Sequence, residues 1–231
     1  MRYVRRLVLS GACNVRDLGG YPCTNGISAW HKCYRSDMLN KLTEEDWMQL
    51  RNADIRLILD LRSVTEQRTA AYDSEAYGIT RVALPFMKEE VPLAETLDQE
   101  AQKRFLDSMK LDYVEMISAV PDAVCQALRL ILKTLRDGHA VLFHCTAGKD
   151  RTGILADYQV SATYNAKGVN SLLPPHMMAI PQIRALFEST PEMLQPLLQL
   201  LDEQGCSAYL EAIGMQHSEL EELRTLLCDS E

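Results

Sequence analysis

Short apolar runs, each bounded by polar or turn-forming residues, predict three strands. The first covers residues 55–61 and is interrupted only by Arg56 and Asp60. The second covers residues 79–84, which a proline ends, and the third covers residues 140–143. The short, largely aliphatic run 55–61, which follows a predicted helix, is typical of a buried strand in a parallel sheet. We therefore predict a central parallel sheet.

Apolar residues spaced three or four apart predict helices around these strands. One helix begins near Thr43, which is followed by acidic residues, as at many helix starts. A longer helical pattern covers residues 93–136 in two segments. Pro121 begins the second segment, and Gly138 follows its end.

Beyond residue 153 the pattern predicts a helix over residues 154–164 and then an irregular, partly apolar segment over residues 167–181 that could cover a site. The remaining C-terminal part is predicted to be helical throughout. Gly205 and Gly214 are expected to end helices, and Ser218 and Glu221 are expected to form a capping box.

The N-terminal part predicts a small ribbon of strands. Residues 3–9 alternate weakly and predict an edge strand, and Gly19-Gly20 marks a tight turn. Asn25-Gly26, just before the run 27–34, is a strong hairpin signal. Together these elements predict an α/β fold: a mostly parallel central sheet flanked by helices, with an N-terminal β-ribbon. At 231 residues, we expect one domain over residues 1–231.

Composition restricts the classes of partner and compartment. The chain has 24 Lys and Arg against 32 Asp and Glu, a net charge of −8, so we expect no binding to nucleic acid or to an anionic membrane. Seven cysteines without paired spacing favour a reducing compartment and predict a cytoplasmic protein. The apolar run 7–9 is too short for a signal peptide, and no run approaches transmembrane length.

Residues 140–153, AVLFHCTAGKDRTG, carry the candidate chemistry. They predict a strand, a tight loop and a helix start, an arrangement whose inward N–H groups bind a tetrahedral oxyanion. Cys145 at the base of this loop is expected to be largely a thiolate, because adjacent positive charge favours the anion. Arg151 offers a planar fork of donors that can hold two phosphoryl oxygens at once.

A plainer interpretation exists for the same residues. A cysteine and an arginine six positions apart occur by chance, and a cysteine after a strand is often only a small core residue. The complete string favours a phosphate-binding loop, since His144 precedes the cysteine, Gly148 stands where the loop must bend, and Thr152-Gly153 follow the arginine.

The string HCTAGKDRTG resembles the phosphate loop of cysteine-dependent phosphatases, in particular that of the atypical bacterial and fungal tyrosine phosphatase family. NVRDLGGY, YRSDML, LILDLRS, YLEAIGM and ELEELR resemble further segments of that family in the same order. The resemblance implies an α/β phosphatase fold and the hydrolysis of phosphomonoesters on protein tyrosine, serine or threonine, or on phosphoinositides. No histidine spacing here indicates a metal, and we expect no cofactor.

The resemblance assigns roles within the loop. We expect Cys145 to attack phosphorus while Arg151 and the loop N–H groups hold the equatorial oxygens. Lys149 is expected to add positive charge at the mouth, which suits substrates with more than one phosphate. Thr152 either donates a hydrogen bond to the sulfur or is an ordinary helix-start hydroxyl. The loop residues expected to contact the substrate are Thr146, Ala147, Gly148, Lys149 and Thr152.

The leaving oxygen needs a proton, which a nearby carboxylic acid usually supplies. The resemblance implies that Asp150, inside the loop, is this acid. Asp60, or an acid between Glu89 and Asp112, is an alternative, and the plain interpretation of Asp150 is an outward, solvated charge.

Three residues near the loop have less specific signals. Arg62 follows the strand 55–61, and neighbouring parallel strands end at one edge of a sheet, so Arg62 is expected near the loop as a substrate contact. Arg16 either contacts the substrate or forms a structural ion pair with Asp17. His144 is expected to orient the Cys145 backbone through hydrogen bonds.

One departure from the family and two rival functions remain. Ile154 runs almost directly into Ala156-Asp157-Tyr158, where family members usually carry a longer apolar helix, so a helix behind the loop is expected to be missing. A rhodanese-like sulfurtransferase also places a cysteine in an anion-binding loop, but the continuation 150–153 argues against it. A noncatalytic phosphate-binding module is the second rival, although Cys145 and Arg151 are both intact.

Overall fold

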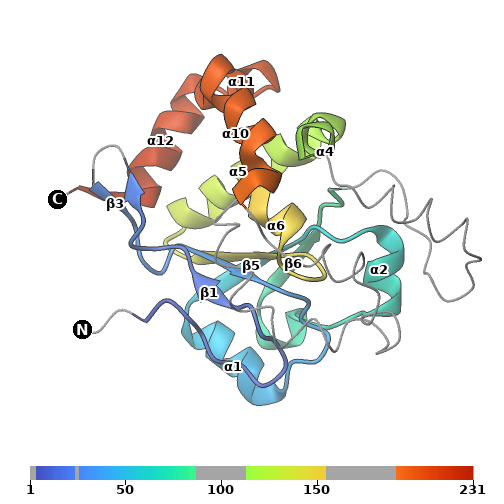
Figure 1. The fold of residues 1–231 in the computed structure, drawn as a ribbon. Coiled ribbons are helices and arrows are strands. Elements are labelled where there is room, and N and C mark those ends of the chain that lie inside the picture. The colour runs from blue at the N-terminus through green and yellow to red at the C-terminus, as the bar shows by residue number, and fades with distance from the viewer. Residues whose placement is uncertain (1–3, 24–25, 87–112, 155–190, 231) are drawn as a thin grey trace, which may run out of the picture.

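A five-stranded sheet lies at the centre of the protein, with helices above and below it (Figure 1). The structure is a computed structural model that describes residues 4–23, 26–86, 113–154 and 191–230. The strand order in this sheet is β1-β4-β7-β5-β6. The strands are β1 (Arg16–Asp17), β4 (Cys33–Ser36), β5 (Ile55–Asp60), β6 (Thr80–Ala83) and β7 (Ala140–His144).

Four of these strands are parallel, and only β1 pairs antiparallel with its neighbour β4. This confirms the predicted α/β fold with a mostly parallel central sheet. Every residue of β7 is buried, including His144, which follows the apolar run 140–143. The carboxyl ends of β4, β5 and β7 meet at one edge, where His144 pairs in register with Ser36 and with Asp60.

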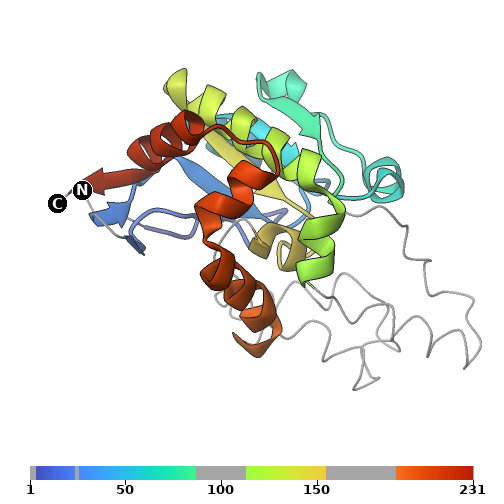
Figure 2. The ribbon, with the colours of Figure 1, turned by 90° about the horizontal axis from the view of Figure 1, so that it is seen from above.

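Helices cover both faces of the sheet (Figure 1), and Figure 2 looks down on the layer formed by α5 and the C-terminal helices. On one face α1 (Glu44–Asn52) packs Trp47 and Leu50 into a core with Ile58 and Leu142. On the other face a larger core surrounds Leu59 and Phe143. The helices of this second layer are α4 (Tyr113–Ala119), α5 (Pro121–Arg136), α10 (Pro191–Gln204), α11 (Cys206–Ala212) and α12 (His217–Leu227).

The predicted ends of α1 and α5 are confirmed. Thr43 caps α1 in a capping box with Asp46. Pro121 is the first residue of α5, and Gly138 follows that helix with a positive φ of 84°.

The predicted capping box at Ser218 and Glu221 is wrong. The helix α12 begins at His217, so Ser218 lies inside its first turn, where its backbone is already helical. Gln216 and Glu219 form the capping box instead.

The N-terminal ribbon differs from its prediction in two respects. Among the described residues of the expected strand 3–9, one isolated bridge from Arg6 to Arg16 replaces a regular strand. The predicted hairpin forms, as β2 (Pro22–Cys23) and β3 (Gly26–Ser28), but the run 27–34 is not one strand. The chain turns through His31, at a φ of 63°, and enters the main sheet as β4.

The shorter elements complete the described chain. The strand β8 (Cys228–Ser230), which has no apolar pattern to predict it, pairs with β3. Between β5 and β6 lie α2 (Val64–Thr69) and the 3₁₀ helix η1 (Glu75–Tyr77), and α6 (Asp150–Ile154) follows the loop.

Several predictions lie outside the described residues. They are the helix beyond Ile154, the segment 167–181, the helical pattern before residue 113 and the missing helix behind the loop. Within the described ranges, no helix is both long and apolar enough to cross a membrane.

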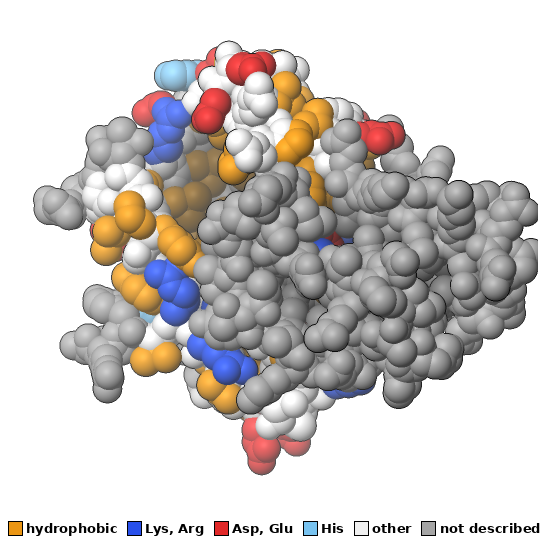
Figure 3. Space-filling view, in the orientation of Figure 1, with side chains coloured by type: hydrophobic (Ala, Val, Ile, Leu, Met, Phe, Trp, Pro, Cys, Tyr) orange, Lys and Arg blue, Asp and Glu red, His pale blue; other side chains and the backbone are white. Residues whose placement is uncertain are grey.

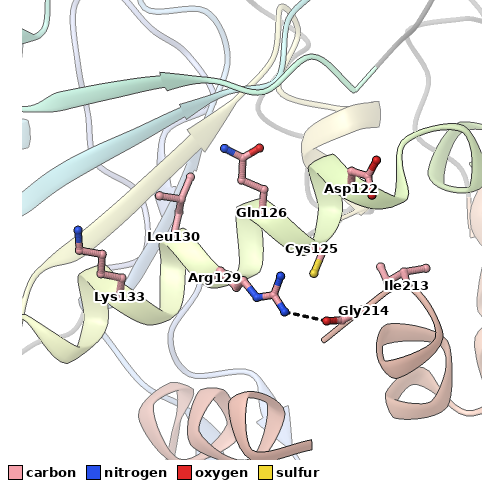
Figure 4. A pocket seen from close by; sticks show the side chains of 8 residues that line it. All are labelled: Asp122, Cys125, Gln126, Arg129, Leu130, Lys133, Ile213 and Gly214. Atoms are coloured by element: carbon pink, nitrogen blue, oxygen red, sulfur yellow. Dashed lines mark hydrogen bonds between the residues drawn. The ribbon is translucent and has the colours of Figure 1, made fainter. Parts of the chain in front are cut away.

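A cavity of about 440 Å³ lies between α5 and the turn that follows α11 (Figure 4). Arg129 reaches across it and donates a hydrogen bond of 2.7 Å to the carbonyl of Gly214. Its lining contains no residue of the candidate loop. Hydrophobic side chains also reach the surface over the C-terminal helices, near the top of Figure 3. In α10, Leu198 is 52% exposed.

Candidate active site

Hydrogen bonds from outside the loop hold four consecutive loop carbonyls, those of residues 146–149. The backbone N–H of Met38 donates to the first at 3.1 Å. The side-chain amide of Asn14 donates to the second at 3.3 Å and to the third at 3.0 Å. Arg35 donates to the third and, at 3.4 Å, to the fourth. Because a trans peptide points its N–H opposite to its C=O, the N–H groups of residues 147–150 face the other way.

Sequence reasoning missed the roles of Asn14 and Arg35. Both side chains are completely buried, and Arg16 supports the first by donating to its side-chain and backbone oxygens. Asp37 accepts the backbone N–H of Asn14 at 3.0 Å and so fixes its position. A signal was present for Arg35, since YRSDML places it at a position that β4 buries, and NVRDLGGY likewise places Arg16 and Asp17 in the buried strand β1.

Gly148 confirms the predicted bend of the loop. Its φ is 63°, and a Cβ atom there would lie 2.4 Å from the carbonyl oxygen of Ser36. Any other residue would therefore have to displace the backbone of the neighbouring strand.

His144 holds the backbone of Cys145, as predicted. Its Nδ1 lies 3.0 Å from the Cys145 carbonyl, which can only accept, so Nδ1 carries the hydrogen. Its Nε2 then accepts from the Tyr72 hydroxyl at 2.6 Å. Burial lowers the pKa of His144 to about 4, so the ring is neutral at physiological pH. Cys145 itself is 2% exposed.

Asp60 is not suited to be the general acid. Burial alone would raise its pKa, but the hydrogen bonds of Arg62 and the charges of Arg62 and Arg81 outweigh burial and lower the pKa to about 2. Asp60 is therefore ionised and holds no proton to donate at neutral pH.

Arg62 faces Asp60 and not the loop, contrary to its prediction as a substrate contact. Its Nε and Nη2 donate to the two Asp60 oxygens at 2.9 and 2.7 Å, and its Nη1 donates to the Ala70 carbonyl at 2.9 Å. Its side chain is 1% exposed. The shared edge of the sheet brings Arg62 near the site, but the buried carboxylate takes its donors.

Glu66 is a site residue that sequence reasoning missed. Its carboxylate accepts from Nη1 and Nη2 of Arg151 at 2.6 and 3.0 Å, and it also accepts from the Thr146 hydroxyl. Burial opposes ionisation, but Arg151, Thr146 and the Ser63 N–H together lower the pKa of Glu66 to about 2. Within the described ranges, the Nε–H of Arg151 has no hydrogen-bond partner.

The sequence contains only an indirect signal for the contact between Glu66 and Arg151. Ser63 and Glu66 form the capping box of α2, directly after β5. That motif predicts a helix start, but nothing in it indicates that the carboxylate also reaches Arg151.

Asp150 lies beside two donors. The Tyr113 hydroxyl donates to its Oδ1, and the Lys149 ammonium lies 3.2 Å from the same oxygen. Lys149 does not extend from the mouth as predicted, since its side chain is 2% exposed, whereas that of Asp150 is 19% exposed. Asp150 is therefore partly exposed but held, which differs from an outward, solvated charge.

Thr152 is completely buried, and its hydroxyl finds no hydrogen-bond partner among the described residues, the Cys145 sulfur included.

Asp17, the partner considered for Arg16, accepts the Gly19 N–H at 2.8 Å and so anchors the predicted turn. The described part of the chain has no cluster of three or more His, Cys, Asp or Glu that could hold a metal.

The sequence model of the tyrosine phosphatase family matches residues 7–156, which include β1 to β7 and the whole loop. This chain belongs to the tyrosine phosphatase family. Within that family, a tyrosine-protein phosphatase of Nostoc commune is 35% identical over 126 residues, which cover 53% of this chain and 40% of the relative. The Cupriavidus necator protein H16_A0669 is 28% identical over 146 residues, which cover 62% of this chain and 52% of the relative. The chain thus spans about half the length of these relatives, or less.

Solved structures of phosphatases also match. Tk-PTP in its active form has a TM-score of 0.35 at 16% identity, with 75% of this chain and 92% of that chain covered. PTPMT1 in complex with PI(5)P has a TM-score of 0.36 at 16% identity, with 77% and 95% covered.

Proposed function

We propose that residues 1–231 form a single phosphatase domain that hydrolyses phosphomonoesters through a phosphocysteine on Cys145. The observation that carries the proposal is the one-sided anchoring of the loop carbonyls 146–149, which turns successive N–H groups toward the opposite side. Arg151 adds a guanidinium whose Nε edge has no hydrogen-bond partner among the described residues. Such a set of donors suits the three equatorial oxygens of a transferring phosphoryl group.

The proposed reaction has two steps. In the first, the Cys145 thiolate forms a bond to phosphorus, the ester P–O bond breaks, and Asp150 gives its proton to the leaving oxygen. In the second, water attacks phosphorus, the P–S bond breaks and returns the thiolate, and the proton of the water passes to Asp150. Arg151 and the N–H groups of residues 147–150 hold the phosphoryl oxygens in both steps.

We propose phosphotyrosine on proteins as the main substrate class. The support is membership of the family and the name of the Nostoc commune relative. Phosphoserine, phosphothreonine and phosphoinositides present the same phosphomonoester group, which makes dual specificity part of the proposal. The seven free thiols are consistent with a reducing, cytoplasmic environment.

Hydrolysis of an aryl phosphate by the wild type, Cys145→Ser and Asp150→Asn tests this function. We expect Cys145→Ser to abolish phosphate release and Asp150→Asn to slow an alkyl phosphate far more than an aryl phosphate, because the poorer leaving group needs the proton more. Full activity of Cys145→Ser would refute the mechanism. Thiocyanate formation from thiosulfate without phosphate release would indicate a sulfurtransferase, and phosphate binding without turnover would indicate a binding module.

A further inference from the structure

Among the described residues, the carboxylate of Asp150 is held from one side. The Tyr113 hydroxyl and the Lys149 ammonium both contact Oδ1, the latter at 3.2 Å. Within the described part of the chain, Oδ2 has no hydrogen-bond partner. The two oxygens of one carboxyl group therefore have different surroundings, which a freely rotating surface side chain would not maintain.

Tyr113 is well placed to fix this orientation. It is the first described residue of α4, it is 2% exposed, and it belongs to the large hydrophobic core on that face of the sheet. The helix α4 also contacts α6, the element that Asp150 opens. A packed aromatic ring has few rotamers, so its hydroxyl presents a donor at a defined position.

A second tyrosine of the same core shows the ordinary alternative. Tyr209 is partly buried against the same cluster, and its hydroxyl donates to the backbone carbonyl of Ile117 in α4, at 3.5 Å. The hydroxyl of this partly buried tyrosine thus finds a backbone acceptor on α4 without reaching the loop. The Tyr113 hydroxyl instead donates to Asp150, the carboxylate that serves as the acid in the proposed function.

We propose that Tyr113 is a positioning residue for the proton transfer, and this inference rests on the proposed function. Tyr113 and Lys149 occupy Oδ1, so the transferred proton resides on Oδ2. The clamp on Oδ1 keeps Oδ2 directed at the leaving oxygen in the first step and at the attacking water in the second. Tyr113 itself exchanges no proton with the substrate.

The test is Tyr113→Phe, with Tyr209→Phe as the matched control that removes a hydroxyl from the same core. Hydrolysis is measured on a series from nitrophenyl phosphate to alkyl phosphates. We expect Tyr113→Phe to lower kcat about 10-fold for alkyl phosphates and less than about 3-fold for nitrophenyl phosphate, with KM nearly constant, because only the poor leaving group depends on an aligned acid. Tyr209→Phe should leave kcat unchanged for both the alkyl phosphates and nitrophenyl phosphate.

The double variant Tyr113→Phe/Asp150→Asn gives a second readout. A residue that acts through Asp150 adds nothing once that carboxyl is gone, so the double variant should match Asp150→Asn. Additive losses, or an equal loss for all leaving groups, would show a structural role and overturn the inference. Thermal unfolding of both Phe variants checks that the core is intact.

Failure of the proposed function gives a different result. If the wild type shows no Cys145-dependent hydrolysis, both the function and this inference fail. If hydrolysis depends on Cys145 but Tyr113→Phe has the leaving-group dependence of Tyr209→Phe, this inference alone fails.

Discussion

Two arginine–carboxylate pairs lie near the carboxyl edge of the sheet and differ in how the guanidinium is used. Arg62 meets Asp60 through Nε and Nη2, and its Nη1 is taken by a backbone carbonyl. Arg151 meets Glu66 through Nη1 and Nη2 and leaves Nε without a hydrogen-bond partner among the described residues. The first pair is 1% and 0% exposed, and the second is 11% and 32% exposed.

The difference shows which arginine can accept a ligand. A phosphoryl group binds along the edge of a guanidinium that offers two parallel N–H groups. Asp60 already occupies that edge on Arg62, whereas Glu66 clamps Arg151 at its far end and leaves the Nε edge open. The closed pair has its donor edge filled by Asp60, and the open pair is suited to bind a dianion.

Replacing each arginine by lysine gives the largest expected contrast. Arg151→Lys should lower kcat/KM by about 1,000-fold, because an ammonium cannot bridge two phosphoryl oxygens. Arg62→Lys should keep kcat of the folded protein within about 3-fold but lower the free energy of unfolding by roughly 2 kcal/mol, through loss of a bidentate buried pair. Phosphatase assays and urea unfolding of both variants measure this. A comparable loss of activity in both would contradict the division of roles.

The same contrast explains what the sequence could predict. Cys145, Gly148 and the strand that leads to them follow from local pattern, because their roles depend on neighbours in the chain. Glu66 and Tyr113 reach the loop from 85 and 37 residues away, respectively, and no local spacing encodes such a contact.

Arg62 shows the opposite failure. Its position at the end of β5 was predicted correctly, but position alone does not tell which acceptor a side chain selects. Asp60, two residues earlier in the chain, is completely buried and needs a partner, so it captures the guanidinium. The prediction of one strand over residues 27–34 is wrong for a similar reason. Its apolar pattern cannot show that the chain turns at His31 and passes from one sheet to another.

His144 connects the closed pair to the loop, and its titration should be visible in stability. Its pKa is about 4 in the folded protein and about 6.5 when unfolded, so between these values only the unfolded chain binds the proton. Stability is therefore full above pH 6.5 and falls as the pH drops toward 4, by roughly 3 kcal/mol for this one group. Urea unfolding across this range measures the slope.

Other groups also change the pH dependence of stability. Burial raises the pKa of Asp37, so its proton uptake in the folded protein raises the free energy of unfolding as the pH falls. The contribution of His144 is therefore measured by comparing the wild type with a variant that lacks this histidine. His144→Asn keeps a donor for the Cys145 carbonyl but does not titrate, so its pH slope should be shallower by about one proton between pH 6.5 and 4. His217→Asn changes a side chain that is 75% exposed and should leave the slope as in the wild type. Equal slopes in all three proteins would contradict a buried neutral His144.

The smallest expected effect concerns the clamp on Arg151. Glu66→Gln keeps an acceptor for Thr146 but loses the charge and one of the two hydrogen bonds to the guanidinium. If Glu66 holds Arg151 so that its Nε edge faces the substrate, kcat/KM should fall about 10-fold, which corresponds to about 1.4 kcal/mol of lost transition-state binding. Glu75→Gln, at an exposed position of η1, is the control and should have no effect.

The sign of the Glu66→Gln effect distinguishes two uses of the same ion pair. A carboxylate that competes with the phosphoryl group for Arg151 would inhibit the enzyme, and its neutralisation would raise kcat/KM and tighten phosphate binding. A carboxylate that supports Arg151 from behind gives the opposite result. The end-on geometry favours support, because Glu66 contacts Nη1 and Nη2 and leaves the Nε edge open. A rise in kcat/KM would therefore place Glu66 in the path of the substrate and reduce the contrast between the two arginines to one of exposure.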